Sequence, residues 1–196
     1  IESFSSPSAR MALQVRFFEK QVLLEDQIMA KAAAEHPGEK VVVVCDSGLP
    51  SGKAYVEPDM WTRLEKMVGV TTARMLDRYH GAVVLETVAS YDKSLYEFGA
   101  GSNNEARYHN PDQAVREVQP ALVDEWSQHP RYRYVKARED FSEKLDDFFA
   151  SLVEVLPAKI AKRLRASSDG RPVKLSREVD ELARFLAQPP LEAVRG

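Results

Sequence analysis

The segment Val41-Val42-Val43-Val44-Cys45-Asp46-Ser47-Gly48 joins four β-branched apolar residues to a cysteine, an acid, a serine and a glycine. Such a run predicts a strand over 41–46 that is buried on both faces, as in parallel sheets covered by helices. Asp46 is then expected at the carboxyl end of this strand, the edge at which open α/β sheets bind their ligands.

Helices alternate with strands on both sides of this segment. Proline at position 120 is expected to kink or split the helix that contains it. Helices are predicted over 8–35, 58–67, 71–79, 111–126 and 140–156, and strands over 41–46, 82–88 and 132–135. This alternation predicts an α/β fold with a mostly parallel sheet and helices on both faces.

Charge divides the chain into two regions. Residues 157–196 contain nine Lys/Arg and five Asp/Glu, whereas the whole chain has a net charge of −3. We therefore predict an α/β domain over 1–156 and a basic C-terminal extension over 157–196, with a linker at 167–172 and a short helix at 177–186. The acidic body argues against nucleic-acid binding, and the basic tail suits an acidic protein or lipid surface.

The composition narrows the class of protein. The sequence has no apolar run long enough to cross a membrane and no signal-peptide core. Its single cysteine, Cys45, excludes an internal disulfide and suits a reducing compartment, where we expect it as a small packed residue. Because the chain begins at Ile1, we expect a processed chain or part of a longer one, in the mitochondrial matrix or the cytoplasm, and not secreted.

The segment Gly48–Lys53 imitates a phosphate-binding loop. Only three residues separate Gly48 from Gly52, whereas a true loop needs four so that its amides can surround the phosphates. Ala54 also replaces the hydroxyl residue that would bind Mg²⁺. We therefore do not expect this loop to bind phosphate.

Motifs spread over 41–149 resemble the AAA-type P-loop NTPase and kinase-like family that includes the nicotinamide riboside kinase domain and the TRPL translocation-defect protein. They run in the expected order. These motifs are Leu24-Glu25-Asp26, Cys45-Asp46-Ser47-Gly48, Gly52-Lys53-Ala54-Tyr55, Trp61, Asp77-Arg78-Tyr79, Asn103-Asn104, Arg107, Trp126, His129-Pro130, Asp140-Phe141 and Lys144.

The resemblance implies a P-loop kinase-like fold and a set of site residues. Asp46 resembles the acid that helps to hold Mg²⁺ or a substrate hydroxyl, and Arg78, Asn104 and Arg107 resemble residues that bind nucleotide or phosphate. Phosphoryl transfer needs such charges and little covalent chemistry from the protein. Each residue also has a structural alternative, since Asp46 could cap a loop, Arg78 could pair with Asp77 or Glu86, and Asn103-Asn104 could belong to a turn.

The sequence departs from the family at several positions. No P-loop and strand precede the first long helix, Ser47 replaces an arginine, Ser51 replaces a second acid, and His109 stands where an acid is usual. The chain as written therefore has no expected cofactor or metal site; ATP or GTP with Mg²⁺ is implied only if the P-loop segment exists. In the family the P-loop strand lies between the strands expected at 41–46 and 82–88. Without it, these two strands must pair with each other, or another segment or protein must fill the gap.

Three functions remain open. The first is a degenerate kinase-like domain, a pseudoenzyme that serves as a structural or accessory subunit of a larger protein complex. The second is an active NTP-binding kinase or NTPase whose P-loop segment is absent from this sequence. The third is a binding module in which Tyr96, Phe98 and Tyr108, together with the basic tail, contact a lipid or a partner protein.

Overall fold

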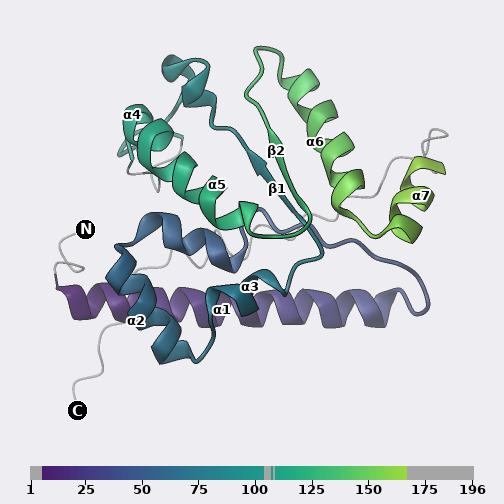
Figure 1. Ribbon diagram of the computed structural model, residues 1–196, viewed down its shortest axis with the longest axis horizontal. Helices are drawn as coiled ribbons and strands as arrows, with labels where there is room; N and C mark the ends of the chain where they lie inside the picture. Colours follow the sequence, from purple (N-terminus) through teal and green to yellow (C-terminus); the bar gives the residue numbers. More distant parts are fainter. Residues whose placement is uncertain (1–5, 104–106, 108, 167–196) are drawn as a thin grey trace. The chain divides into compact units, whose positions relative to one another are not determined.

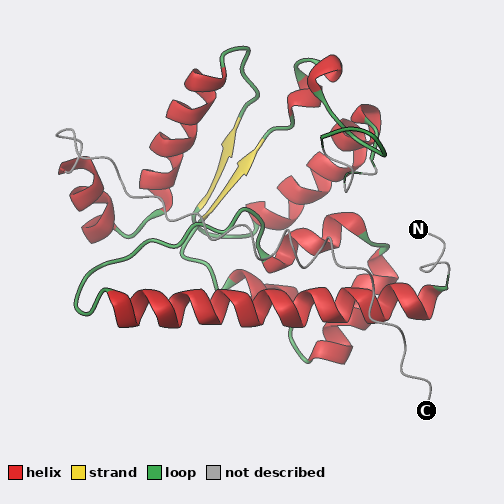
Figure 2. Cartoon of the chain, turned by 180° about the vertical axis from the view of Figure 1, so that it is seen from behind, coloured by secondary structure: helices red, strands yellow, loops and turns green. Residues whose placement is uncertain are grey.

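A computed structural model describes residues 6–103, 107 and 109–166, and one compact unit extends to Arg165 (Figures 1 and 2). The helices are α1 (Pro7–Glu35), α2 (Pro58–Val68), α3 (Thr72–Leu76), α4 (Pro111–Gln113), α5 (Gln119–Ser127), α6 (Phe141–Val155) and α7 (Ala158–Ala166). Shorter helical turns are η2 (Leu49–Tyr55), η3 (Val88–Ser90), η4 (Lys93–Leu95) and η5 (Ala114–Val118). The strands are β1 (Ala82–Leu85) and β2 (Tyr132–Val135).

The two strands form a parallel sheet with helices on both sides. β1 pairs with β2 in the register Ala82↔Tyr132 to Leu85↔Val135. The chain passes between the strands through α4, η5 and α5, and α5 and α6 lie on opposite sides of the pair (Figures 1 and 2). This confirms the predicted α/β class, with a parallel sheet reduced to two strands in the described part of the chain.

The prediction of a buried strand over 41–46 is wrong. Residues 41–45 pair with no strand, and Val41 and Val44 are 42% and 53% exposed. Cys45 is exposed as well, rather than packed as expected. A run of valines favours extended backbone, but a strand also requires a neighbour with which to exchange hydrogen bonds, and the described residues supply none.

Local signals set most helix ends as predicted. The Ser6 side chain caps α1, and α2 ends at Gly69, whose φ of +68° needs a glycine. The side chain of Thr71 caps α3, which stops at Leu76 rather than continuing to Tyr79. Asp140 caps α6 by accepting a hydrogen bond from the Ser142 amide. The strand predicted over 82–88 is shorter and ends at Leu85, whereas β2 has the predicted bounds.

Pro120 splits the helix that begins at Pro111, as predicted. Because proline has no amide hydrogen, the regular hydrogen-bond ladder cannot continue through it. The turn before it, η5, is a wider π-type turn in which the Gln119 amide donates to the Ala114 carbonyl. The helix then resumes as α5 and delivers Glu125 and Trp126 to the interior.

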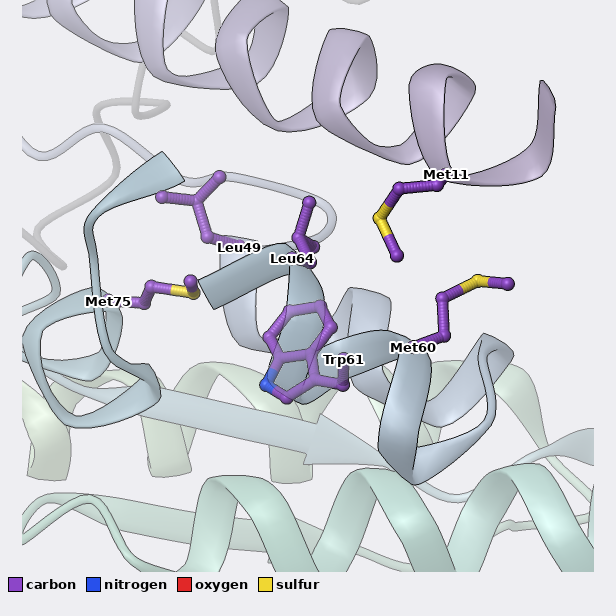
Figure 3. Close-up of a cluster of buried hydrophobic side chains, with 6 residues drawn as sticks. All are labelled: Met11, Leu49, Met60, Trp61, Leu64 and Met75. Carbon is purple, nitrogen blue, oxygen red and sulfur yellow. The ribbon is translucent and has the colours of Figure 1, made fainter. Parts of the chain in front are cut away.

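Two hydrophobic clusters hold the elements together. In the first, Met11 of α1, Leu49 of η2, residues of α2 and Met75 of α3 surround Trp61 (Figure 3). In the second, Trp126 of α5 packs with Ala82 and Val84 of β1 on one face of the sheet. The segment 41–48 leads from α1 to η2, and both of these elements contribute to the first cluster.

The C-terminal predictions fall partly outside the described residues. The linker at 167–172 and the helix at 177–186 lie beyond Ala166. α7 occupies the start of the predicted extension. Within the described ranges, every helix is too short or too polar to traverse a lipid bilayer.

Candidate functional site

Asp46 lies in the bend between α1 and η2. Its side chain is exposed, and no described residue forms a hydrogen bond or ion pair with it. The next residue along is fixed, because Gln21 Nε2 donates to the Ser47 carbonyl oxygen at 2.8 Å. Asp46 is therefore held at the surface beside α1 by its neighbour.

Arg78 is engaged by two acids of α1. Its Nε and Nη2 lie 3.2 Å from Glu25 Oε2, and its Nη2 lies 2.7 Å from Asp26 Oδ1. Its guanidinium thus already has two carboxylate partners. The predicted alternative of a pair with Asp77 or Glu86 is wrong, because Arg78 instead pairs with Glu25 and Asp26 of α1.

Tyr79 joins the same group of residues to η2. Its hydroxyl donates to Glu25 Oε1 at 2.7 Å and accepts from the Leu49 amide at 2.8 Å. Burial, with the negative charge of Glu25 nearby, raises the pKa of the Tyr79 hydroxyl, which therefore remains a donor. We call Gln21, Glu25, Asp26, Arg78 and Tyr79 the α1 anchor.

Lys53 is the second cation near this loop that forms an ion pair with a carboxylate. Its Nζ donates to Glu125 Oε2 at 2.6 Å, and the Glu125 side chain is only 2% exposed. The other oxygen, Oε1, is buried without a hydrogen-bond partner among the described residues. Since a buried carboxylate needs a compensating charge, Lys53 is required for the stability of Glu125.

Trp126, next to Glu125, packs against the segment that contains Gly48 and Ser51. Its Nε1 donates to Ser51 Oγ at 2.9 Å, and its ring meets the Tyr79 ring edge-on at 5.3 Å. A Cβ added to Gly48 would lie 2.7 Å from the Trp126 ring, so only glycine fits there. Gly48 thus allows the Trp126 ring to pack closely against the backbone of the loop.

Arg107 lies in the loop after β1. Its Nη1 donates to the Glu97 carbonyl oxygen at 3.2 Å, and its guanidinium stands 4.6 Å from the centre of the Tyr96 ring. This is a cation–π contact that closes the loop on itself. Asn104 and Tyr108 lie outside the described residues.

The predicted site residues that the structure describes lie in two separate regions. Asp46 and Arg78 belong to the region of the α1 anchor, and Arg78 precedes the amino end of β1. Arg107 belongs to the loop after the carboxyl end of the same strand. Among the described residues, no group of three or more His, Cys, Asp or Glu side chains is arranged to hold a metal ion.

Sequence reasoning missed Glu125 and gave no role to His129, which it named only within a motif. Glu125 is almost fully buried. His129 donates from Nε2 to the Tyr79 carbonyl oxygen and accepts the Arg131 amide at Nδ1, which fixes its tautomer. The Pro130 that follows His129 was the available signal, since it marks a turn before a strand.

Comparisons with protein families, with curated protein sequences and with solved structures give no match to this chain. The functional argument therefore depends on the residues themselves.

Proposed function

We propose that this chain is a degenerate P-loop kinase-like domain that acts as a non-catalytic structural or accessory subunit of a larger protein complex. We place it in the mitochondrial matrix or the cytoplasm. The order of the motifs supports the family assignment, and the parallel strand–helix–strand unit is compatible with an α/β fold. The basic C-terminal segment is a further candidate contact with partner subunits.

One observation carries the proposal. Two cations flank the loop that contains Asp46, namely Arg78 and Lys53. Both form ion pairs with carboxylates, at 2.6–3.2 Å. A phosphate would have to compete with Glu25, Asp26 and Glu125 for them. Binding a polyphosphate depends on available cations and amides, so these cations support structure rather than catalysis.

Exposed apolar side chains favour a role in assembly. Leu85, Phe141 and Phe149 are 44%, 69% and 49% exposed. Large apolar groups gathered at a surface mark sites of protein association.

The test is the mass of the native assembly. The protein should be isolated from its source under gentle conditions, as the wild type and as Asp46→Ala. We expect an assembly much larger than one chain in both cases, because Asp46 takes no part in it. A monomeric wild type, or an Asp46→Ala variant that loses a phosphoryl-transfer activity of the wild type, would refute the proposal.

An active NTP-dependent kinase or NTPase is the second candidate. The observation in its favour is the exposed carboxylate of Asp46, which no described residue engages and which could bind Mg²⁺ or a substrate hydroxyl. This candidate requires nucleotide binding that Asp46→Ala weakens, whereas the first requires none.

A further inference from the structure

The outer edge of β1 is unpaired in the described structure. The Ala82 amide donates to the Arg131 carbonyl and the Glu86 amide donates to the Val135 carbonyl, so these residues face β2. In a parallel ladder the next residues point the other way, which directs the amides and carbonyls of Val83 and Leu85 to the opposite edge. The sheet of the described residues consists of β1 and β2 alone, so no described strand pairs with the outer edge of β1.

Contacts of α6 show which of its sides lies over which strand. Arg133 of β2 donates from Nε to Glu154 Oε2 at 2.6 Å. Towards β1, Lys144 Nζ donates to the Glu86 carbonyl at 2.7 Å, and Val155 lies so close to Gly81 that a Cβ there would be 2.5 Å away. α6 therefore spans both strands on the face opposite α5.

A strip of apolar residues continues around α6 beyond β1. At about 3.6 residues per turn, Phe141, Leu145 and Phe149 follow the β1-facing side and extend past the free edge. These three residues, which we call the α6 strip, are 69%, 38% and 49% exposed. Leu85 shares the sheet face that α6 covers and is 44% exposed, so the apolar surface reaches the free edge itself.

One acidic residue borders the α6 strip. Asp146 lies about 60° around the helix from Phe149, whereas Glu143 lies at least about 120° from every residue of the strip. Both are exposed, and no described cation forms an ion pair with either. The other two carboxylates of the helix, Asp147 and Glu154, pair with Arg138 and Arg133. The outer border of the strip therefore suits a positively charged partner.

We propose that the free edge of β1 and the α6 strip together bind a strand–helix segment of a partner protein. The partner strand forms main-chain hydrogen bonds with Val83 and Leu85. Its helix lays an apolar face on the α6 strip and brings a Lys or Arg side chain to Asp146. An unpaired edge supplies the backbone affinity, and the neighbouring helix supplies the specificity. This inference rests on the proposed role as a subunit and names the surface used.

A synthetic peptide provides the probe. It combines a strand of about five alternating Val and Thr residues with a helix of about 15 residues that carries Leu on one face and Lys beside it. A matched peptide replaces every Lys by Glu. Binding to the full chain is measured by fluorescence anisotropy at low and high salt, and amide exchange is followed by NMR in the free and bound protein.

The expected results concern both halves of the surface. The amides of Val83 and Leu85 should become protected on binding, whereas that of Val84, which already faces β2, should change little. The Glu peptide should bind about ten-fold or more weakly than the Lys peptide at low salt. Leu145→Asp and Phe149→Asp should each weaken binding by about ten-fold, whereas Met67→Asp on α2, where Met67 is 62% exposed, should not.

Three results would overturn the inference. These are the absence of saturable binding at millimolar peptide, binding that leaves the exchange of Val83 and Leu85 unchanged, and protection of these amides by self-association of the chain without peptide. If the peptide fails while the native assembly persists, only this surface is refuted. Nucleotide-dependent activity would instead refute the proposed function.

Discussion

Lys53 of η2 and Glu125 of α5 form an ion pair at 2.6 Å between residues 72 positions apart in the sequence. The Glu125 side chain is 2% exposed and its second oxygen has no described partner, so Lys53 is the described cation that compensates this buried carboxylate. The pair holds η2, which follows Asp46, against α5. It also occupies the charge of Lys53 with a carboxylate.

Removing Lys53 should therefore leave a buried charge without compensation. We expect Lys53→Met to lower the free energy of unfolding by about 2–3 kcal/mol, at or just below the usual range for breaking a buried pair because Lys53 is partly exposed. The double variant Lys53→Met/Glu125→Gln should recover part of the loss. Urea denaturation measures both. A loss below about 0.5 kcal/mol for Lys53→Met would contradict this view of the pair.

Arg78 should matter for stability because it ties α1 to the rest of the fold. Arg78→Ala leaves Glu25, whose side chain is 11% exposed, without its cation, and should cost about 1–3 kcal/mol. Arg63→Ala is the matched control, since its ion pair with Asp59 is exposed on both sides and should cost about 0–1 kcal/mol. Equal losses in the two variants would show that the α1 anchor is no more than a surface pair.

Gly48 should not tolerate a side chain. A Cβ would lie 2.7 Å from the Trp126 ring and 2.9 Å from the Tyr79 ring. Because neither ring can move freely, Gly48→Ala should cost about 1–3 kcal/mol. Gly52→Ala, where the nearest atom is at 3.2 Å, should cost less. Thermal unfolding of the two variants gives the comparison.

Tyr134 should make stability fall at alkaline pH. Burial, and then hydrogen bonding to Glu86 and its charge, raises the pKa of Tyr134 to about 12 from a usual value near 10. The folded protein then retains a proton that the unfolded chain releases. The associated stability is complete below pH 10 and is lost as the pH rises towards 12. In a urea series across this range Tyr134→Phe should show a shallower decline, and an unchanged slope would exclude Tyr134 as the cause.

The sequence was sufficient for the elements whose signals are local. Caps such as Thr71 and Asp140, the stop at Gly69 and the break at Pro120 act on their own neighbours. Their effects follow from backbone geometry alone. The alternation of strands with helices likewise predicted a mostly parallel sheet, and the structure shows β1 paired with β2 in parallel.

The sequence could not show what depends on distant partners. The four valines of 41–44 predict extended backbone, but pairing depends on a neighbouring strand that the pattern does not specify. Glu125 gives no local sign of burial, because its partner Lys53 comes from another element. For the same reason Arg78 was assigned to phosphate binding, a role that remains a prediction, while the structure shows its contacts with Glu25 and Asp26.

The most direct test of the central claim is thermal unfolding of the protein, isolated from its source, with and without MgATP or MgGTP. A nucleotide at 100 times its dissociation constant would add about 2.7 kcal/mol of stability. For a chain of this size that would raise Tm by several degrees, at about 2–4 °C per kcal/mol. We predict no shift with either nucleotide at millimolar concentration. A saturable rise in Tm that Asp46→Ala reduces would contradict the account and establish the chain as a nucleotide-binding protein.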